Sequence, residues 1–184
     1  MNFTPAPGLP DIVIIEPTLF EDQRGFFTEM YHQEKFAQAG IGEHFVQDNL
    51  SRSKKGTLRG LHYQVARPQG KIVWVLSGEV YDVAVDIRRG SPTFGKWVAT
   101  ILSDANRKGV YVPPNFAHGF CVLSEEADFY YKCTDFYSPP HERCIRWNDP
   151  DLAIEWPTKD PLLSEKDATA PLLKDADLPS YFGS

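Results

Sequence analysis

Residues 80–87 read VYDVAVDI, and the alternation of side chains in this stretch indicates the fold class. Apolar side chains occupy the odd positions, Tyr81, Val83, Val85 and Ile87. Small or acidic side chains occupy the even positions, Val80, Asp82, Ala84 and Asp86. A period of two is typical of a β-strand with one face in a core and the other against something polar. That polar region is either water or the cavity of a barrel, so Asp82 is either a solvated carboxylate or a residue that supports a site.

The rest of the chain has a similar character. Short β-rich runs are separated by Gly, Pro, Asn and Asp, without repeats or long helices, which favours a sandwich or barrel. A short surface helix is predicted within residues 30–41, where Met30, Phe36 and Ala37 form an apolar stripe and Gly40 supplies a stop. Residues 156–182, rich in Pro and Asp, are expected to wrap the domain as loops and short helices.

The length of 184 residues and the 42% hydrophobic content predict one domain, residues 1–184. It divides into N-terminal strands and a short helix (1–50), a barrel core (51–148) and C-terminal loops and short helices (149–184). The formal charge of -6 and the lack of a Lys/Arg-rich block argue against nucleic acid as a partner. No signal peptide and no apolar run of about 20 residues is seen, so we expect a cytoplasmic protein that does not bind membranes.

The cysteines Cys121, Cys133 and Cys144 have no metal-binding spacing, which predicts buried thiols in a reducing compartment. Residues 57–71, TLRGLHYQVARPQGK, carry Arg59, His62 and Lys71 among apolar neighbours. A solvated strand face and a cation-lined pocket both explain this pattern. Arg59 and His62 have opposite parity, so they share a face only if the strand is irregular between them. Gly60 lies there, and we hypothesise a bulge that turns both side chains into one cavity.

Two short motifs resemble those of cupins, which are jelly-roll β-barrels. Gly78 lies in a turn after a strand, and the segment from Pro114 to His118 has the Pro-x-x-x-His form of the second cupin motif. Metal cupins read His-x-His followed by Glu, whereas this chain has Gln64 after His62 and no Glu before Glu79. Too few donors remain for a divalent ion, so we predict no metal.

Longer segments identify the chain as similar to the dTDP-4-dehydrorhamnose 3,5-epimerase family. These are, in order, RGFFTE (24–29), FVQDNLSRSKKGTLRGLHYQ (45–64), GEVYDVAVDIRRGSPTFG (78–95), PPNFAHGF (113–120), YYKCTDFYSP (130–139) and SEKDATAPLL (164–173). The resemblance implies an all-β, cupin-type jelly-roll barrel with short peripheral helices in the N-terminal third and at the C-terminus. It also implies a homodimer, no cofactor, and dTDP-4-dehydro-6-deoxyglucose as substrate.

The resemblance also assigns the chemistry. His62 matches the base that removes the acidic hydrogens at C3 and C5, and imidazole suits this task because its reference pKa lies near neutrality. Asp167 matches the carboxylate that orients the base, although Ser164 and Asp167 also have the form of a helix-capping box. Tyr131 matches the proton donor on the opposite face of the sugar, which a phenol serves if nearby cations lower its pKa. Tyr130 then points to the other face. Lys71 matches the cation that holds the enolate oxygen.

Further positions match substrate contacts of the family. Arg24 and Glu29 match positions that contact the nucleotide, and Phe26, Glu142 and Lys166 match further substrate contacts. Those in and around the long motif are Gln47, Asp48, Asn49, Arg59 and His118. Tyr137, together with Phe136, is expected to stack on thymine, although core packing explains Phe136 equally well. Asp82 is hypothesised to support His118.

Several alternatives remain open at this point. One is a metal-dependent cupin enzyme, a second is a ketoisomerase acting on the same nucleotide sugar, and a third is a binding module without turnover. Within the epimerases, inversion of a single centre, C3 or C5, is a further possibility. In the expected homodimer, residues 10–20, PDIVIIEPTLF, are the segment expected to cross between subunits.

Overall fold

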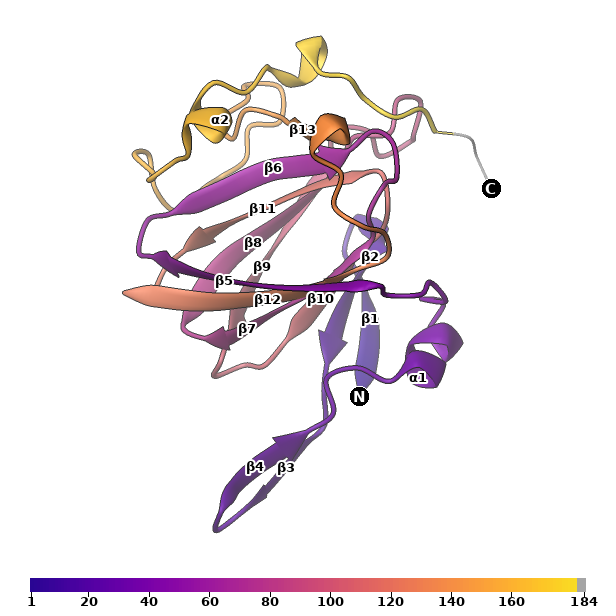
Figure 1. Ribbon diagram of the computed structural model, residues 1–184, viewed down its shortest axis with the longest axis vertical. Coiled ribbons are helices and arrows are strands. Elements are labelled where there is room, and N and C mark those ends of the chain that lie inside the picture. The colour runs from indigo at the N-terminus through magenta and orange to yellow at the C-terminus, as the bar shows by residue number, and fades with distance from the viewer. Residues whose placement is uncertain (182–184) are drawn as a thin grey trace.

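The protein is built from two facing antiparallel sheets (Figure 1). The computed structural model describes residues 1–181. The six-stranded sheet has the order β1 (Asn2–Ala6), β2 (Leu9–Glu16), β10 (Gly109–Val112), β7 (Lys71–Ser77), β12 (Glu126–Cys133), β5 (Gln47–Lys54). The five-stranded sheet has the order β13 (Glu142–Cys144), β6 (Leu58–Gln64), β11 (Phe116–Val122), β8 (Glu79–Asp86), β9 (Trp97–Ser103). This arrangement confirms the jelly-roll prediction, as two facing sheets that are not joined into a closed barrel.

The remaining elements are short and peripheral. They are the hairpin β3 (Leu19–Asp22) and β4 (Gly25–Thr28), the helices α1 (Gln33–Gln38) and α2 (Glu165–Ala168), and the 3-10 turns η1 (Pro139–His141) and η2 (Leu173–Asp175). The predicted surface helix is thus shorter than expected, and Phe36 is its buried residue while Ala37 faces solvent. None of the helices in residues 1–181 is long and apolar enough to cross a membrane.

The main core lies between the sheets. Val73 and Phe129 of the six-stranded sheet pack there with Ala84 and Phe120 of the five-stranded sheet, and the rings of Phe120 and Phe129 stack with centroids 4.0 Å apart. Phe120 and Phe129 also form part of the wall of a cavity, which is lined by residues of β5, β6, β7, β11 and β12.

Both faces of strand β8 are buried, whereas the sequence predicted only one buried face. Its even positions Val80 and Ala84 belong to the core between the sheets. Its odd positions Val83 and Val85 pack in a second cluster under the C-terminal segment, with Leu173 among its members. The C-terminal segment thus wraps the outer face of the five-stranded sheet as expected, although its predicted end at residues 182–184 lies outside the described residues.

The irregularity predicted at Gly60 is present. In the pairing of β6 with β11, His62 lies opposite His118 but Arg59 lies opposite Phe120, so β6 holds one extra residue in this interval. Gly60 has φ +134°, and a Cβ there would lie 2.6 Å from the Cα of Gly119. A Cβ at Gly119 would likewise lie 2.7 Å from the backbone oxygen of Arg59, so both paired strands need glycine at this close approach. The bulge turns Arg59 and His62 toward the same cavity, which confirms the hypothesis.

Residues 10–20, the segment predicted to cross between subunits, divide between β2 and the hairpin strand β3 in the single chain. Residues 9–16 form β2, which is paired on both sides within its own sheet, with β1 and β10. The segment that leaves the body of the molecule is the hairpin β3–β4, which projects away from the sheets at the bottom of Figure 1.

Candidate active site

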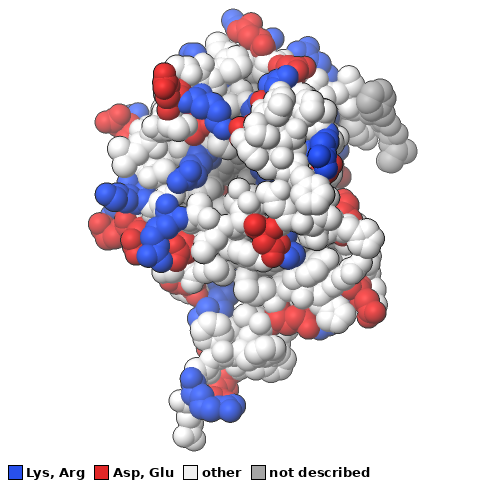
Figure 2. All heavy atoms as spheres, in the orientation of Figure 1, with Lys and Arg blue, Asp and Glu red and all other residues white. Residues whose placement is uncertain are grey.

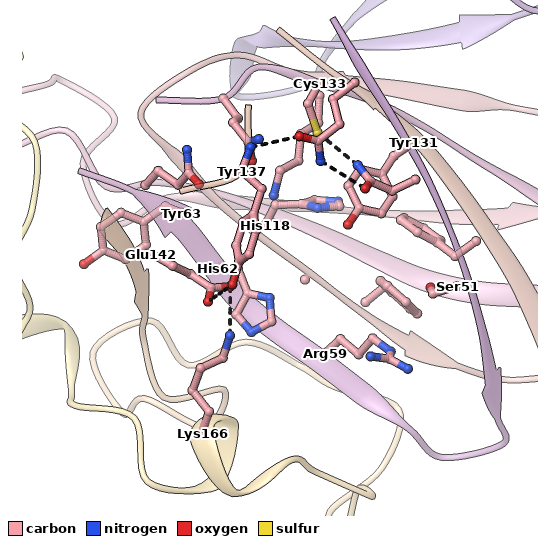
Figure 3. Close-up of a pocket in the computed structure, with 18 residues that line it drawn as sticks. Ser51, Arg59, His62, Tyr63, His118, Tyr131, Cys133, Tyr137, Glu142 and Lys166 are labelled. Atoms are coloured by element: carbon pink, nitrogen blue, oxygen red, sulfur yellow. Dashed lines mark hydrogen bonds and ion pairs between the residues drawn. The ribbon is translucent and has the colours of Figure 1, made fainter. Parts of the chain in front are cut away.

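A cavity of about 400 Å³ lies between the two sheets (Figure 3). Most of the residues expected at a substrate site line it: Gln47, Asn49, Arg59, His62, Lys71, His118, Tyr131, Tyr137, Glu142 and Lys166. His62 and His118 come from the five-stranded sheet, whereas Lys71 and Tyr131 come from the facing sheet. The cavity therefore places ionisable groups on both sides of any molecule that it holds.

His62 forms a short hydrogen bond with Asp167. Its Nε2 lies 2.6 Å from Oδ1 of Asp167, whose side chain is almost fully buried, while the His62 ring is partly exposed to the cavity. Nδ1 of His62 has no hydrogen-bond partner among residues 1–181. With the Nε2 proton donated to the carboxylate, the lone pair of a neutral His62 lies on Nδ1. The pair thus has the geometry of an oriented base.

The capping and pairing roles of Asp167 do not compete. Oγ of Ser164 accepts a hydrogen bond from the backbone N–H of Asp167 at 3.2 Å, which leaves the carboxylate free for His62. The thiol of Cys144 also donates to Oδ1 of Asp167, at 3.5 Å, because Cys144 lies opposite His62 in the pairing of β13 with β6. Burial raises the pKa of Asp167, but the hydrogen bond and charge of His62 and the bonds from Ser164 and Cys144 outweigh burial and lower that pKa below its usual value.

A second histidine–carboxylate pair lies deeper. Nε2 of His118 lies 2.9 Å from Oδ2 of Asp82, and both side chains are buried. Asp82 is therefore not a solvated carboxylate. The contact agrees with the hypothesis that Asp82 supports His118, since it fixes the ring and leaves Nδ1 for the cavity.

Lys71 lies at the end of β7 without an acidic partner within salt-bridge distance among the described residues. Other residues surround its side chain, but the side chain borders the cavity, so part of its surface remains accessible to solvent. Burial lowers the pKa of Lys71, although the nearby Cys133, Glu142 and Asp82 oppose this effect. An ammonium group held in this way is stabilised by any negative charge that develops in the cavity.

Tyr131 differs from the expectation in one respect. Burial raises the pKa of its phenol, and Cys133 and Glu142 add to the effect, whereas Arg59 lowers it by less. The cations therefore do not bring the pKa of Tyr131 below its ordinary value, and the phenol keeps its proton. Tyr130 points to the other face, as predicted, where its ring stacks on Trp74 and its hydroxyl donates to Asp48.

Tyr137, Glu142 and Lys166 form a network at the rim of the cavity (Figure 3). The hydroxyl of Tyr137 donates to Oε2 of Glu142 at 2.9 Å, and Nζ of Lys166 lies 2.8 Å from Oε1 of the same carboxylate. The network joins β13 to α2, the helix that carries Asp167. Gln47 holds the same rim, because its Oε1 accepts from the backbone N–H of Tyr137 at 2.9 Å.

Several expected contact residues do not line this cavity. Arg24 and Phe26 lie on the projecting hairpin, where Arg24 pairs with Asp22 and Phe26 lies under the guanidinium group of Arg107. Glu29 follows the hairpin and pairs with Lys35 at 2.6 Å.

Asp48 and Phe136 are also outside the cavity. Asp48 is displaced by strand parity, since Gln47 and Asn49 on the same strand point inward, and its carboxylate instead pairs with Lys132 at 2.7 Å. Phe136 is about half exposed, beneath the guanidinium group of Arg67.

No cupin-type metal set is present in the described chain. Gln64, which replaces the second imidazole, donates to the backbone oxygen of Arg67 and accepts from the N–H of Ser138, so it positions loops. The one group in residues 1–181 with donor spacing suited to a cation consists of His62, Cys144 and Asp167.

Comparison with known proteins places the chain in a family. A family model described as dTDP-4-dehydrorhamnose 3,5-epimerase matches residues 7–175. The dTDP-4-dehydrorhamnose 3,5-epimerase of Pseudomonas aeruginosa is 58% identical over 172 residues, which cover 92% of this chain and 95% of that protein. The chain belongs to the dTDP-4-dehydrorhamnose 3,5-epimerase family.

Structural similarity agrees with this membership. A crystal structure of dTDP-6-deoxy-D-glucose-3,5-epimerase from Legionella pneumophila, in complex with dTDP-4-keto-L-rhamnose, matches with a TM-score of 0.96 and 52% identity, over 99% of both chains. The dTDP-4-dehydrorhamnose 3-epimerase of Streptomyces niveus is 42% identical over 180 residues, which cover 95% of this chain and 87% of that protein. The chain is therefore an enzyme of this epimerase family.

Sequence reasoning missed part of the lining of this epimerase cavity. Ser51, Phe120, Phe129 and Cys133 line it in addition to the expected residues. Alternation would have found them, because each lies two residues from an expected lining residue on the same strand. Their mixture of apolar and weakly polar groups completes the wall between the two sheets.

Proposed function

We propose that the protein inverts C3 and C5 of dTDP-4-dehydro-6-deoxy-D-glucose to give dTDP-4-dehydro-L-rhamnose, without a cofactor, in dTDP-L-rhamnose biosynthesis. The observation that carries the proposal is the His62–Asp167 pair on one side of the cavity with Tyr131 on the facing sheet. Inversion needs a base and an acid on opposite faces of the sugar ring, and this arrangement supplies both.

The reaction follows from the states of these groups. The ketone at C4 acidifies the adjacent C–H bond, and Nδ1 of His62 takes the proton while the electron pair moves to the ketone oxygen. The resulting imidazolium is stabilised by Asp167 at 2.6 Å. Lys71 holds the enolate oxygen through its unpaired positive charge. Tyr131 then donates its phenolic proton to the carbon from the opposite face, and solvent restores both groups.

The rim residues are proposed to bind the carrier. Arg59, a guanidinium group at the cavity wall, suits the diphosphate oxygens. Tyr137, which is half exposed, presents a ring on which thymine stacks, and its partner Glu142 offers acceptors to the base. His118, fixed by Asp82, contacts the sugar or the diphosphate.

We further propose a homodimer in which the hairpin β3–β4 reaches the cavity of a second copy. Phe20, Phe26 and Phe27 on the hairpin are exposed by 60, 50 and 67%, which is unusual for a segment without a partner. Arg24, Phe26 and Glu29 match substrate contacts of the family but do not line the cavity of their own chain. Exchange of the hairpin between copies reconciles these two observations.

Incubation with dTDP-4-dehydro-6-deoxyglucose in D₂O, followed by mass spectrometry and NMR of the recovered sugar, tests the reaction. Deuterium at both C3 and C5 with inverted configuration is the expected result. Label at a single centre would replace the proposal by the alternative of a single-centre epimerase, the activity for which the Streptomyces niveus relative is named. A shifted carbonyl would instead indicate a ketoisomerase.

A further inference from the structure

Three potential metal ligands of different chemistry converge behind the cavity. Nε2 of His62, Sγ of Cys144 and a carboxylate oxygen of Asp167 all lie within 4.8 Å of one another. Oδ1 of Asp167 is the common point, 2.6 Å from Nε2 and 3.5 Å from Sγ. They come from β6, β13 and α2, so the fold rather than sequence spacing brings them together.

The spacing is close to that of a zinc site. Zinc binds imidazole nitrogen and carboxylate oxygen at about 2.0–2.2 Å and thiolate sulfur at about 2.3 Å, so tetrahedral geometry separates the donors by roughly 3.3–3.6 Å. The three donor atoms reach this spacing by shifts on the order of 1 Å. Neither carboxylate-only nor cupin-type sites offer this nitrogen, sulfur and oxygen set, which favours borderline or soft cations.

A second hollow gives access to two of the three ligands, His62 and Asp167. It has a volume of about 490 Å³, borders His62 and Asp167, and is walled by Thr57, Leu162 and Ser164. Leu162 is 58% exposed, so the hollow opens to solvent. Arg59 and Lys166 also line the hollow and repel every divalent cation equally. A bound cation must therefore gain enough from its ligands to offset this repulsion. Zinc gains from the thiolate, whereas a hard ion such as Mg²⁺ gains little, so zinc is favoured.

We propose that His62, Cys144 and Asp167 form an inhibitory binding site for zinc-type divalent cations. The cation replaces the proton on Sγ of Cys144, which is released to solvent, and it bonds to Nε2 of His62 and to the carboxylate of Asp167. A neutral imidazole has one N–H proton, and with the cation on Nε2 that proton must lie on Nδ1. Nδ1 then has no lone pair for the substrate, so the cation blocks the base, and no electron transfer is involved.

The inhibitory consequence rests on the proposed role of His62 as the base, whereas the binding does not. The two are therefore measured separately. Co²⁺ serves as a spectroscopic probe, because a thiolate bound to Co²⁺ gives a near-ultraviolet charge-transfer band whether or not the protein is active. Zn²⁺ serves as the inhibitor, with the rate of each variant expressed relative to its own rate in EDTA.

Cys144→Ser is the test variant and Cys133→Ser the matched control, because Cys133 is a second buried thiol, which lines the main cavity near Lys71. In the wild type and in Cys133→Ser we expect the cobalt band and a reversible loss of turnover with micromolar Zn²⁺ but not with Mg²⁺. In Cys144→Ser the band should vanish and the Zn²⁺ concentration for half-inhibition should rise more than tenfold.

Three results would overturn the proposal. They are a cobalt band that disappears in Cys133→Ser instead, the absence of a band in the folded wild type, and a Cys144-dependent band without loss of turnover. A folded protein that shows the band but has no epimerase activity in EDTA would count against the proposed function and leave the metal site supported.

Discussion

The side chain of Lys71 carries a positive charge whose burial destabilises the folded protein. Lys71 has no acidic partner among the described residues, and burial lowers its pKa. The folded state therefore binds the Lys71 proton less tightly than the unfolded state, so this charge destabilises the protein at neutral pH. The penalty decreases as the pH rises through the folded-state pKa toward the ordinary 10.5.

Lys71→Met removes this charge with little change in volume. We expect turnover to fall by about 10²- to 10³-fold, since the enolate loses its cation. The free energy of unfolding at pH 7 should rise by about 1–2 kcal/mol, as measured by urea denaturation. Lys132→Met, whose lysine pairs with Asp48 on the other face of the sheet, is the control and should retain activity. Loss of stability in Lys71→Met would contradict the account.

The decrease of activity at high pH should also depend on Lys71. Because the pKa of Lys71 is lowered by burial and that of Tyr131 is raised, activity at high pH should decline first through deprotonation of Lys71, below pH 10.5. Lys71→Arg keeps its charge, so the residual activity of that variant should extend to higher pH. A limb that does not move between lysine and arginine would assign the decline to another group.

The sequence correctly predicted which side chains point into the cavity where strand alternation or a long motif could be used. Alternation placed Tyr130 and Tyr131 on opposite faces. The same rule, applied to Gln47, Asp48 and Asn49, excludes Asp48 from the cavity, a consequence that the motif comparison obscured. The contact of Cys144 with Asp167 could not be predicted, because it depends on where β13 pairs with β6.

At the scale of elements, the bulge in β6 is what turns Arg59 and His62 to the same side. Gly60→Ala should be severely disruptive, since its Cβ would lie 2.6 Å from the backbone of Gly119 and φ is +134°. We expect a loss of more than about 3 kcal/mol in unfolding free energy, or failure to fold, together with loss of turnover.

Gly42→Ala is the matched control for this substitution. Its Cβ would meet nothing within 4 Å and its φ is not positive. It should stay within about 0.5 kcal/mol of the wild type in thermal or urea unfolding. Equal effects of the two substitutions would show that the close approach of β6 and β11 at Gly60 does not require glycine.

The bulge and the capping box were visible in the sequence as Gly60 and as Ser164 with Asp167. The two buried faces of β8 were not, because alternation of apolar and polar residues does not show that a distant segment covers the outer face. Residues 149–181 do so here, and their polar composition gave no sign of the few apolar side chains, such as Leu173, that anchor them.

At the scale of the whole molecule, the surface contains a segment that the single chain does not bury. The space-filling view shows the hairpin extending from the body, with charged groups near its tip (Figure 2). A comparison of sequences identifies Arg24, Phe26 and Glu29 as contact residues but does not indicate which copy of the chain they contact. This is why their position outside the cavity could not be predicted.

Replacing Phe20 and Phe27 of the hairpin by Ser tests the proposed dimer. Both side chains are more than half exposed, so the monomer should fold normally, whereas the dimer should dissociate at higher protein concentration. Sedimentation velocity over a range of concentrations measures this change, and Val46→Ser, at another exposed apolar position, is the control. A wild type that sediments as a monomer at every concentration would refute the dimer.

If His62 and Tyr131 act on opposite faces of the sugar, loss of Tyr131 should leave hydrogen exchange intact while it abolishes inversion. In D₂O, Tyr131→Phe should still replace the C3 hydrogen of dTDP-4-dehydro-6-deoxyglucose by deuterium, because the base is intact, but the starting configuration should be retained. His62→Asn should abolish both exchange and inversion. NMR of the recovered sugar distinguishes these outcomes, and inversion in Tyr131→Phe at the wild-type rate, or exchange in His62→Asn, would contradict the account.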